Sequence, residues 1–300
     1  MTYALFLLLM LLSAIWGASF LFIKIGVSEM RPLTFGMWRV FIGSVVLITV
    51  IRLRREKLPT DLRTWSRFAV MGVFNALIPF TAIGWGTRLI PSGLSAILNA
   101  TMPLFTFILA ALWGDERLRW SRALGLLIGF GGILILTMPQ LRDGTLSSLW
   151  GELAVILGSL SYAIAAVYAR RHLTGLSPLT SSLGHVFTGF IFFIPFSFSL
   201  EKPWTQPPSS RVLLALLALG ILGTALAYII YYRLIQGLGA TGASLVTYIV
   251  PVFGIFWGWA ILDERLAWNA FAALGMILLG LLLVNNLFSS VFLQTSKPRT

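Results

Sequence analysis

Long apolar stretches, separated by short polar connectors, recur along the whole chain. Each has the roughly 20 residues that a helix needs to cross the apolar core of a bilayer. The stretches are continuous and lack the strict alternation of a half-exposed strand. The sequence therefore predicts an all-α integral membrane protein with ten transmembrane helices, over residues 4–25, 33–51, 68–87, 92–113, 120–138, 149–169, 178–200, 211–232, 240–262 and 268–288.

Two groups of residues occur twice at nearly one offset. Pro-Leu-Thr, Val-Phe and Gly keep the same spacing in 32–43 and in 178–189, which are 146 residues apart. The Asp-Glu-Arg-Leu turn at 115–118 returns at 263–266, an offset of 148. Such an echo indicates a duplicated unit. Because each copy holds five spans, an odd number, the second must insert upside down, as in many secondary transporters.

The repeat and the charge distribution together set the expected topology. We predict a first five-helix repeat over 1–146, an inverted second repeat over 147–288, and a cytoplasmic tail over 289–300. With the N-terminus inside, the inner connectors hold fourteen Lys and Arg residues and the outer ones seven. Since cytoplasmic loops are richer in Lys and Arg, both termini are expected in the cytoplasm.

Composition narrows the class further. Hydrophobic residues make up 58% of the chain, charged residues 11%, and the mean hydropathy is +0.90. The net charge of +12 lies in short connectors, which favours contact with lipid headgroups and argues against nucleic acid as a partner. With no cysteine and only two histidines, disulfides and thiolate metal sites are excluded, and we predict no metal and no cofactor.

Acidic residues are expected only in connectors, or at a span edge in the case of Glu152. Ion-coupled carriers commonly hold the ion with a buried carboxylate. The sequence therefore predicts alternating access without an intramembrane carboxylate, in a facilitator or a loosely coupled exporter.

The motifs of the chain resemble those of one family. A Trp16-Gly17 pair in the first span, Pro103 and Pro251 in the fourth and ninth, and an acidic-Glu-Arg-Leu turn after each of these two are similar to the EamA family of the drug/metabolite transporter superfamily. The resemblance implies that spans 1–4 and 6–9 surround a central cavity, with spans 5 and 10 outside. It also implies a bacterial inner-membrane exporter of small metabolites, and the aromatic lining looks like the amino-acid exporter branch of the YddG type.

Two basic residues occupy equivalent apolar positions in the two copies. Arg39 lies in the second span and His185 in the seventh. Either could meet a substrate carboxylate, and His185 could titrate near neutral pH. The alternative is that both side chains extend to the headgroups, since each is about two turns from a helix end.

Polar groups and prolines share helix faces in several spans. Asn75 and Pro79, Asn99 and Pro103, and Thr247 and Pro251 each stand four residues apart, and each proline leaves a carbonyl free. The asparagines could line a cavity or hold neighbouring helices together. The predicted substrate-binding residues are Trp16, Arg39, Asn75, Asn99, Tyr162, His185, Tyr228, Thr247 and Tyr248, and the predicted hinges are Pro79, Pro103, Pro251 and Gly254.

Several alternatives stay open at this point. A carrier of organic anions or phosphorylated metabolites would need several converging cations, and a membrane-embedded transferase would need clustered acids or a metal site. The Asp-Glu-Arg-Leu turns could form a gate or simply end helices in the headgroup layer. Gly125 and Gly129 could form a dimer face or pack internally, so a monomer is possible and a dimer is not excluded. The expected partners are a small-molecule substrate and membrane lipids.

Overall fold

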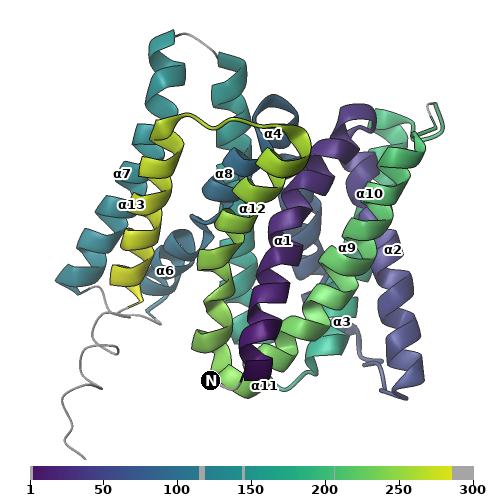
Figure 1. The fold of residues 1–300 in the computed structure, drawn as a ribbon. Helices are drawn as coiled ribbons and strands as arrows, with labels where there is room; N and C mark the ends of the chain where they lie inside the picture. Colours follow the sequence, from purple (N-terminus) through teal and green to yellow (C-terminus); the bar gives the residue numbers. More distant parts are fainter. Residues whose placement is uncertain (1–2, 115–118, 144–145, 206, 286–300) are drawn as a thin grey trace, which may run out of the picture.

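The computed structural model describes residues 3–114, 119–143, 146–205 and 207–285 as a bundle of long helices (Figure 1). In chain order they are α1 (Tyr3–Glu29), α2 (Pro32–Leu53), α3 (Leu62–Gly72), η1 (Val73–Leu77), α4 (Ile78–Leu89), α5 (Ser92–Asn99), α6 (Met102–Leu112), α7 (Trp120–Asp143), α8 (Leu146–His172), α9 (Pro178–Phe196), η2 (Ser197–Glu201), α10 (Ser210–Gly220), η3 (Ile221–Leu226), α11 (Ala227–Ser244), α12 (Val246–Leu262) and α13 (Trp268–Val284).

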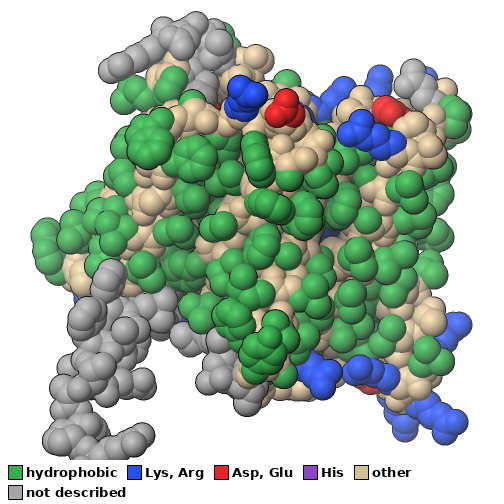
Figure 2. Space-filling view, in the orientation of Figure 1, with side chains coloured by type: hydrophobic (Ala, Val, Ile, Leu, Met, Phe, Trp, Pro, Cys, Tyr) green, Lys and Arg blue, Asp and Glu red, His purple; other side chains and the backbone are tan. Residues whose placement is uncertain are grey.

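The predicted all-α membrane fold is confirmed. Eight helical stretches of the described residues are long and apolar enough to cross a membrane, and two shorter apolar helices, α12 and α13, complete the ten. Figure 2 shows a broad band of hydrophobic side chains with Lys, Arg and acidic residues gathered above and below it. That pattern suits a molecule whose belt faces lipid and whose two ends face water.

The two halves of the chain run in opposite directions. In Figure 1, α1 rises from the N-terminal end of the bundle, whereas α8 descends towards it. The halves also exchange partners: α1 packs on α12, and α8 packs on α5 and α6. The α2 and α9 helices meet each other, as do α7 and α13. This reciprocal packing is what two inverted copies of one five-helix unit produce.

Three spans are interrupted near their centres: the third at η1, the fourth between α5 and α6, and the eighth at η3. The π-helical segment η1 directly precedes Pro79, and the break between α5 and α6 directly precedes Pro103. A proline cannot donate to the carbonyl four residues earlier, which explains both irregularities. The break between α11 and α12, at Leu245, comes before Pro251. The ninth span thus begins at Val246 and not at 240, because α11 extends to Ser244.

Helices α7 and α13 form a pair beside the rest of the bundle (Figure 1). A Cβ atom on Gly280 would lie 2.5 Å from the carbonyl oxygen of Gly125 and 2.7 Å from the backbone nitrogen of Gly129. The glycines therefore let two backbones touch, as small residues do between membrane helices. Of the two alternatives for Gly125 and Gly129, this contact supports internal packing.

Some expected features lie elsewhere or outside the described residues. The third span starts at Leu62 and not at 68, and the sixth at Leu146 and not at 149. The cytoplasmic tail predicted at 289–300 and the turn at 115–118 lie outside the described residues, so both stay predictions.

The early start of α3 has a local cause. The Asp61 carboxylate accepts a 2.7 Å hydrogen bond from the backbone nitrogen of Thr64, which caps the first turn. That hydrogen bond lowers the pKa of the Asp61 carboxyl from its ordinary value.

We expect the start of α3 to loosen in acid. Because the folded-state pKa of Asp61 is depressed, its stabilising effect is present above the unfolded pKa and is lost as pH falls through the folded one. Hydrogen exchange at the Thr64 amide would accelerate over that range. The Asp61→Asn variant keeps a capping side chain and should show no such pH dependence. Equal acid sensitivity in both proteins would contradict this assignment.

Candidate functional site

Arg39 lies at the centre of the bundle on α2, and only 9% of it is exposed. Its Nε donates to the hydroxyl of Thr224 in η3 at 3.3 Å. Its guanidinium lies 3.8 Å from the ring centroid of Phe80 on α4. Among the described residues the Arg39 guanidinium thus contacts a hydroxyl and an aromatic face, and neither is an anion. The burial rules out the alternative in which Arg39 extends to the headgroups.

Tyr228 on α11 joins the two halves beside Arg39. Its hydroxyl is 3.1 Å from Nε2 of His185 on α9 and accepts a 3.5 Å hydrogen bond from the Asn75 amide of η1. His185 is 4% exposed, so it too is buried and does not reach the headgroup layer. Its Nδ1 lies 3.0 Å from the carbonyl oxygen of Ser181. Predicted residues from spans 3, 7 and 8 therefore meet in one polar network.

Aromatic rings surround this network. Trp16 on α1 meets Tyr228 edge-on at 6.5 Å and lies 5.4 Å from Tyr231. Tyr162 on α8 meets Phe80 edge-on at 6.4 Å. Trp16, Tyr162 and Tyr228 are each only half-buried although they contact neighbours from other spans. Part of their surface is accessible, next to the buried guanidinium. We call Trp16, Arg39, Asn75, Phe80, Tyr162, His185, Thr224, Tyr228 and Tyr231 the central cluster.

Three predicted site residues do not join the central cluster. The hydroxyl of Ser159 donates to Asn99 Oδ1 at 3.4 Å, so Asn99 links α5 to α8. Thr247 of α12 donates to the carbonyl of Ser244, the last residue of α11. Tyr248 turns towards α13, where it donates to the carbonyl of Leu281 at 3.2 Å. Asn99 matches the helix-joining alternative, and Tyr248 contacts a peripheral span.

The predicted substrate-binding residues did not include Phe80, Thr224 or Tyr231. Phe80 was one apolar residue in an apolar span, and a single sequence gives no sign of the ring's position. Thr224 belongs to η3, which has the same place in its half as η1 but no proline to mark it. The Thr224 hydroxyl donates to the carbonyl of Leu219, five residues earlier, at 3.0 Å. The π geometry of η3 could not be read from Pro spacing.

The predicted hinges lie at or near real irregularities. Pro79 and Pro103 follow the interruptions described above, and Pro251 lies inside α12. A Cβ on Gly254 would lie 2.4 Å from Cβ of Ala96 in α5, so this glycine permits a close α12–α5 contact. Motion at these positions stays a prediction.

At both ends of the bundle, carboxylates bind the starts of helices from other spans. Glu201, at the end of η2, accepts hydrogen bonds from the backbone nitrogens of Leu33 at 3.1 Å and Thr34 at 2.7 Å, which begin α2. Glu56, after α2, accepts from the hydroxyls of Ser177 and Thr180 at the start of α9, at the opposite end of the bundle. Glu201 thus caps α2, whereas α9 is capped by Ser177, whose hydroxyl accepts from the Thr180 backbone nitrogen and is held by Glu56.

Two further acids act at the same end as Glu201, where Figure 1 shows the α1–α2, α9–α10 and α12–α13 connectors together. Glu264 accepts from the backbone nitrogens of Ser92 at 2.8 Å and Gly93 at 3.2 Å, at the start of α5. Glu29 accepts from the backbone nitrogen of Ser209 at 2.8 Å, before α10. The Asp-Glu-Arg-Leu turn that contains Glu264 therefore joins two spans, and does more than end a helix. We call Glu29, Glu201 and Glu264 the rim carboxylates.

Glu152 corrects an expectation. It was expected at the edge of a span, but α8 begins three residues earlier than predicted, and the Glu152 side chain is completely buried. Neither of its carboxyl oxygens has a hydrogen-bond partner among the described residues. The Glu152 carboxyl group is therefore buried inside the protein, while the absence of an intramembrane carboxylate stays a prediction.

A cavity of about 610 Å³ opens at the end of the bundle that carries the rim carboxylates. Ser28, Glu29, Arg31, Arg88, Pro207 and Pro208 line it, so it lies away from the central cluster. Within the described ranges, no group of three or more His, Cys, Asp and Glu side chains could hold a metal ion.

Two inverted helical repeats that meet at a buried polar cluster define a multi-pass membrane protein of the secondary-transporter type. The chain belongs to the EamA-like transporter family, which matches residues 4–138 and again residues 149–286. The two matches correspond to the two halves of the fold.

Relatives and a solved structure agree with this assignment. The inner membrane transporter YedA of Escherichia coli, described as uncharacterized, is 30% identical over 279 residues, or 90% of this chain and 87% of YedA. The uncharacterized transporter YoaV of Bacillus subtilis is 27% identical over 270 residues, or 90% of each chain. A crystal structure with 19% identity covers 97% of this chain and 99% of its own, with a TM-score of 0.67. That last similarity concerns the fold alone.

Proposed function

We propose that this protein exports small amphipathic metabolites, foremost neutral and aromatic amino acids, across a bacterial inner membrane by alternating access. The observation that carries the proposal is the buried Arg39 guanidinium, which meets a hydroxyl and an aromatic ring but no anion among its described contacts. A buried cation without a counter-ion is costly, and such residues inside membranes mark substrate pathways. The carboxylate of a substrate would supply the missing charge.

The aromatic residues of the central cluster could bind the side chain and the ammonium group of an amino acid. Trp16, Tyr162 and Tyr228 present half-buried rings that can enclose an apolar or aromatic side chain. An ammonium group could lie over a ring face or bind the Tyr228 hydroxyl. These contacts come from both halves, so a substrate there would bridge the two repeats.

The rim carboxylates support alternating access. They fasten the starts of α2, α5 and α10 to segments that follow other spans. We propose that this end of the bundle is a closed gate in the present conformation. Opening it would break these capping bonds and rock the spans at their π segments and prolines. By the charge count, this end faces the outside.

A carrier of phosphorylated metabolites is less well supported. Doubly charged phosphate is best held by several converging cations. Among the described residues of the central cluster, Arg39 is the only arginine, and there is no lysine. One guanidinium matches one carboxylate, which favours amino acids over phosphate esters. We therefore propose transport and not catalysis for this site.

Flux into liposomes tests the proposal. Purified protein in liposomes should carry labelled neutral and aromatic amino acids, and unlabelled ones should compete. The matched protein-free liposomes should not. If neither flux nor competition by these amino acids occurs while the protein remains folded, the proposed substrate class is wrong.

The expected orientation can be checked with single cysteines, since the chain has none of its own. Arg54 and Lys202 are exposed at opposite ends of the bundle. We expect a membrane-impermeant maleimide to label Lys202→Cys in intact cells, and to label Arg54→Cys only after lysis. The reverse pattern would place the termini outside the cell.

A further inference from the structure

The most unusual group outside the central cluster is the carboxyl group of Glu152. It lies six residues into α8, or about 9 Å along the helix axis from Leu146. Its side chain has no exposed surface, and both oxygens lack a partner among the described residues. Burying an ionised carboxylate without a partner is far more costly than burying the neutral acid.

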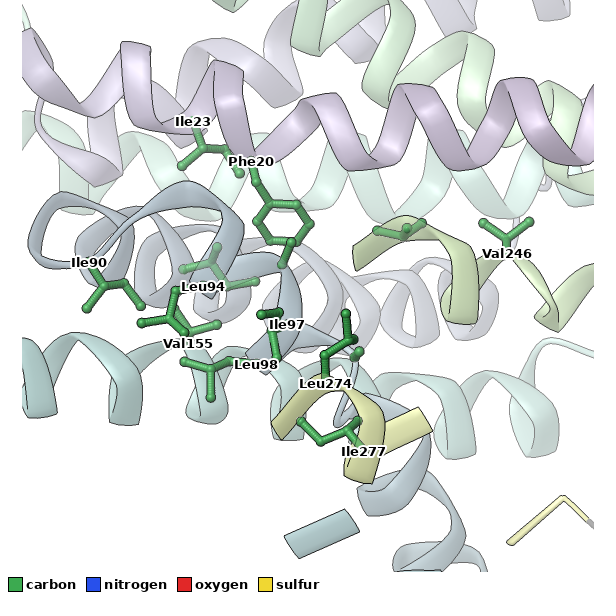
Figure 3. Packing of buried hydrophobic residues seen from close by; sticks show 14 of the residues in the cluster. Phe20, Ile23, Ile90, Leu94, Ile97, Leu98, Val155, Val246, Leu274 and Ile277 are labelled. Atoms are coloured by element: carbon green, nitrogen blue, oxygen red, sulfur yellow. The ribbon is translucent and has the colours of Figure 1, made fainter. Parts of the chain in front are cut away.

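The surroundings of Glu152 are tightly packed and apolar. A Cβ on Gly86 of α4 would lie 2.5 Å from the carbonyl oxygen of Gly151, so the two backbones touch beside it. One turn further along α8, Val155 lies among Ile90, Leu94 and Leu98 of the neighbouring spans (Figure 3). Along α8, Glu152 thus lies between the Gly151–Gly86 contact and Val155.

Two charged groups near this end, Lys24 and Glu264, bind other partners. Lys24 on α1 donates to the carbonyl oxygens of Thr87 and Ile90, both at 2.8 Å, and Glu264 caps α5. Glu152 therefore stands apart from the ionic contacts that fasten the gate. Among the described side chains, the charged and titratable residues on α8 and on the elements that pack against it are, besides Glu152, Arg63 and Arg67 of α3, Arg88 of α4, Arg122 of α7, and Tyr162, Tyr168, Arg170, Arg171 and His172 of α8 itself.

We propose that Glu152 is a proton-binding site that controls the gate. While the gate is closed, Glu152 is the neutral acid. When α4 and α8 separate, water reaches the carboxyl group, which ionises and gives its proton to water in the outer compartment. Closing requires the reverse step, in which the carboxylate takes a proton from that water. Acid on the outer side therefore favours the closed gate.

The direction of the pH effect distinguishes Glu152 from the rim carboxylates. Protonating Glu29, Glu201 or Glu264 would weaken bonds that hold the gate shut, so acid acting there would favour opening. Acid acting on Glu152 favours closing. The direction of the pH response thus reports which group is in control.

Infrared spectroscopy tests the protonation without any need for a substrate. In reconstituted wild-type protein at neutral pH we expect a carbonyl-stretch band from a protonated carboxyl group. The Glu152→Gln variant should lack the band, and the Glu29→Gln variant, altered at an exposed rim carboxylate, should retain it. If the wild type shows no such band, or if Glu152→Gln retains it, the proposal is overturned.

Transport measurements test the control of the gate, and this part rests on the function proposed above. Lowering the pH on the outer side should slow wild-type flux. The Glu152→Gln variant, always neutral, should show slow flux that no longer responds to pH, and Glu152→Asp should restore the response. Wild-type flux that is insensitive to outer pH, or accelerated by acid, would overturn the gating role. If no amino acid is transported at all, the proposed function fails, while the infrared result still decides the proton site.

Discussion

Replacing Arg39 by glutamine should raise the apparent KM for amino-acid transport by about 10- to 100-fold. A hydrogen bond to a charged group contributes about 1.5–3 kcal/mol, and each 1.4 kcal/mol is a factor of ten in affinity. Arg39 is buried beside the accessible rings, so its loss removes the one positive charge of the central cluster. Initial rates in liposomes over a range of substrate concentrations would give the change.

A substrate analogue without a carboxylate tests directly whether Arg39 binds that group. An amine that lacks the carboxylate should compete equally well against wild type and Arg39→Gln, because it never used the guanidinium. The Arg54→Gln variant removes an exposed charge from the end of the same helix and should leave KM unchanged. If Arg39→Gln weakens the carboxylate-free amine as much as the amino acid, Arg39 shapes the site and does not bind the carboxylate.

Replacing Gly280 by leucine should separate α13 from α7 and lower the stability of the fold. Even a Cβ there would lie 2.5 Å from the Gly125 carbonyl oxygen and 2.8 Å from Cα of Gly129, and backbone cannot move aside as a side chain can. Overpacking typically costs about 1–3 kcal/mol, and occasionally more. Thermal unfolding in detergent, followed by tryptophan fluorescence, should show a lower midpoint.

Gly275 is the matched control on the same helix. A Cβ at that position has nothing within 4 Å, so Gly275→Leu should unfold close to the wild-type temperature. Both variants add the same side chain to the same apolar helix, and they differ only in what it meets. Equal unfolding temperatures for the two would show that the α7–α13 contact does not hold the bundle together.

The sequence predicted the fold well because its signals were long and redundant. Each span needs about 20 apolar residues in a row, and polar connectors bounded them clearly. The echo of 32–43 at 178–189 revealed the duplication, and α2 and α9, which contain these segments, now face each other. Boundaries shifted where a local contact extended a helix, as the Asp61 cap does for α3.

The central cluster was predicted in part, and the reason is physical. Polar residues in an apolar span stand out, so Arg39, Asn75 and His185 were found from the sequence. Which of them meet depends on how helices rotate about their axes, and one sequence does not specify this. From the sequence alone, Tyr248 and Tyr228 were both predicted to bind substrate. In the structure the Tyr248 hydroxyl contacts α13, whereas the Tyr228 hydroxyl contacts His185 in the central cluster.

The burial of Glu152 was missed for a related reason. Its position near a predicted span edge suggested contact with water. Three extra residues at the start of α8 and the glycine contact with α4 place it inside the protein. A residue near the predicted end of a span is therefore not always exposed to water, because neighbouring helices can extend beyond it and bury it.

Glu56 and Glu201 each bind the start of a helix in the other half, and this bears on how such a chain could have arisen. Glu56 follows α2 and binds the hydroxyls of Ser177 and Thr180 at the start of α9. Glu201 follows α9 and caps α2, so each half supports a helix end of the other. A single half would leave the start of α2 without its cap, and the Ser177 cap of α9 without its acid partner. An ancestor with one copy would have needed a second molecule inserted the opposite way round, and gene fusion would then have fixed the antiparallel pair in one polypeptide.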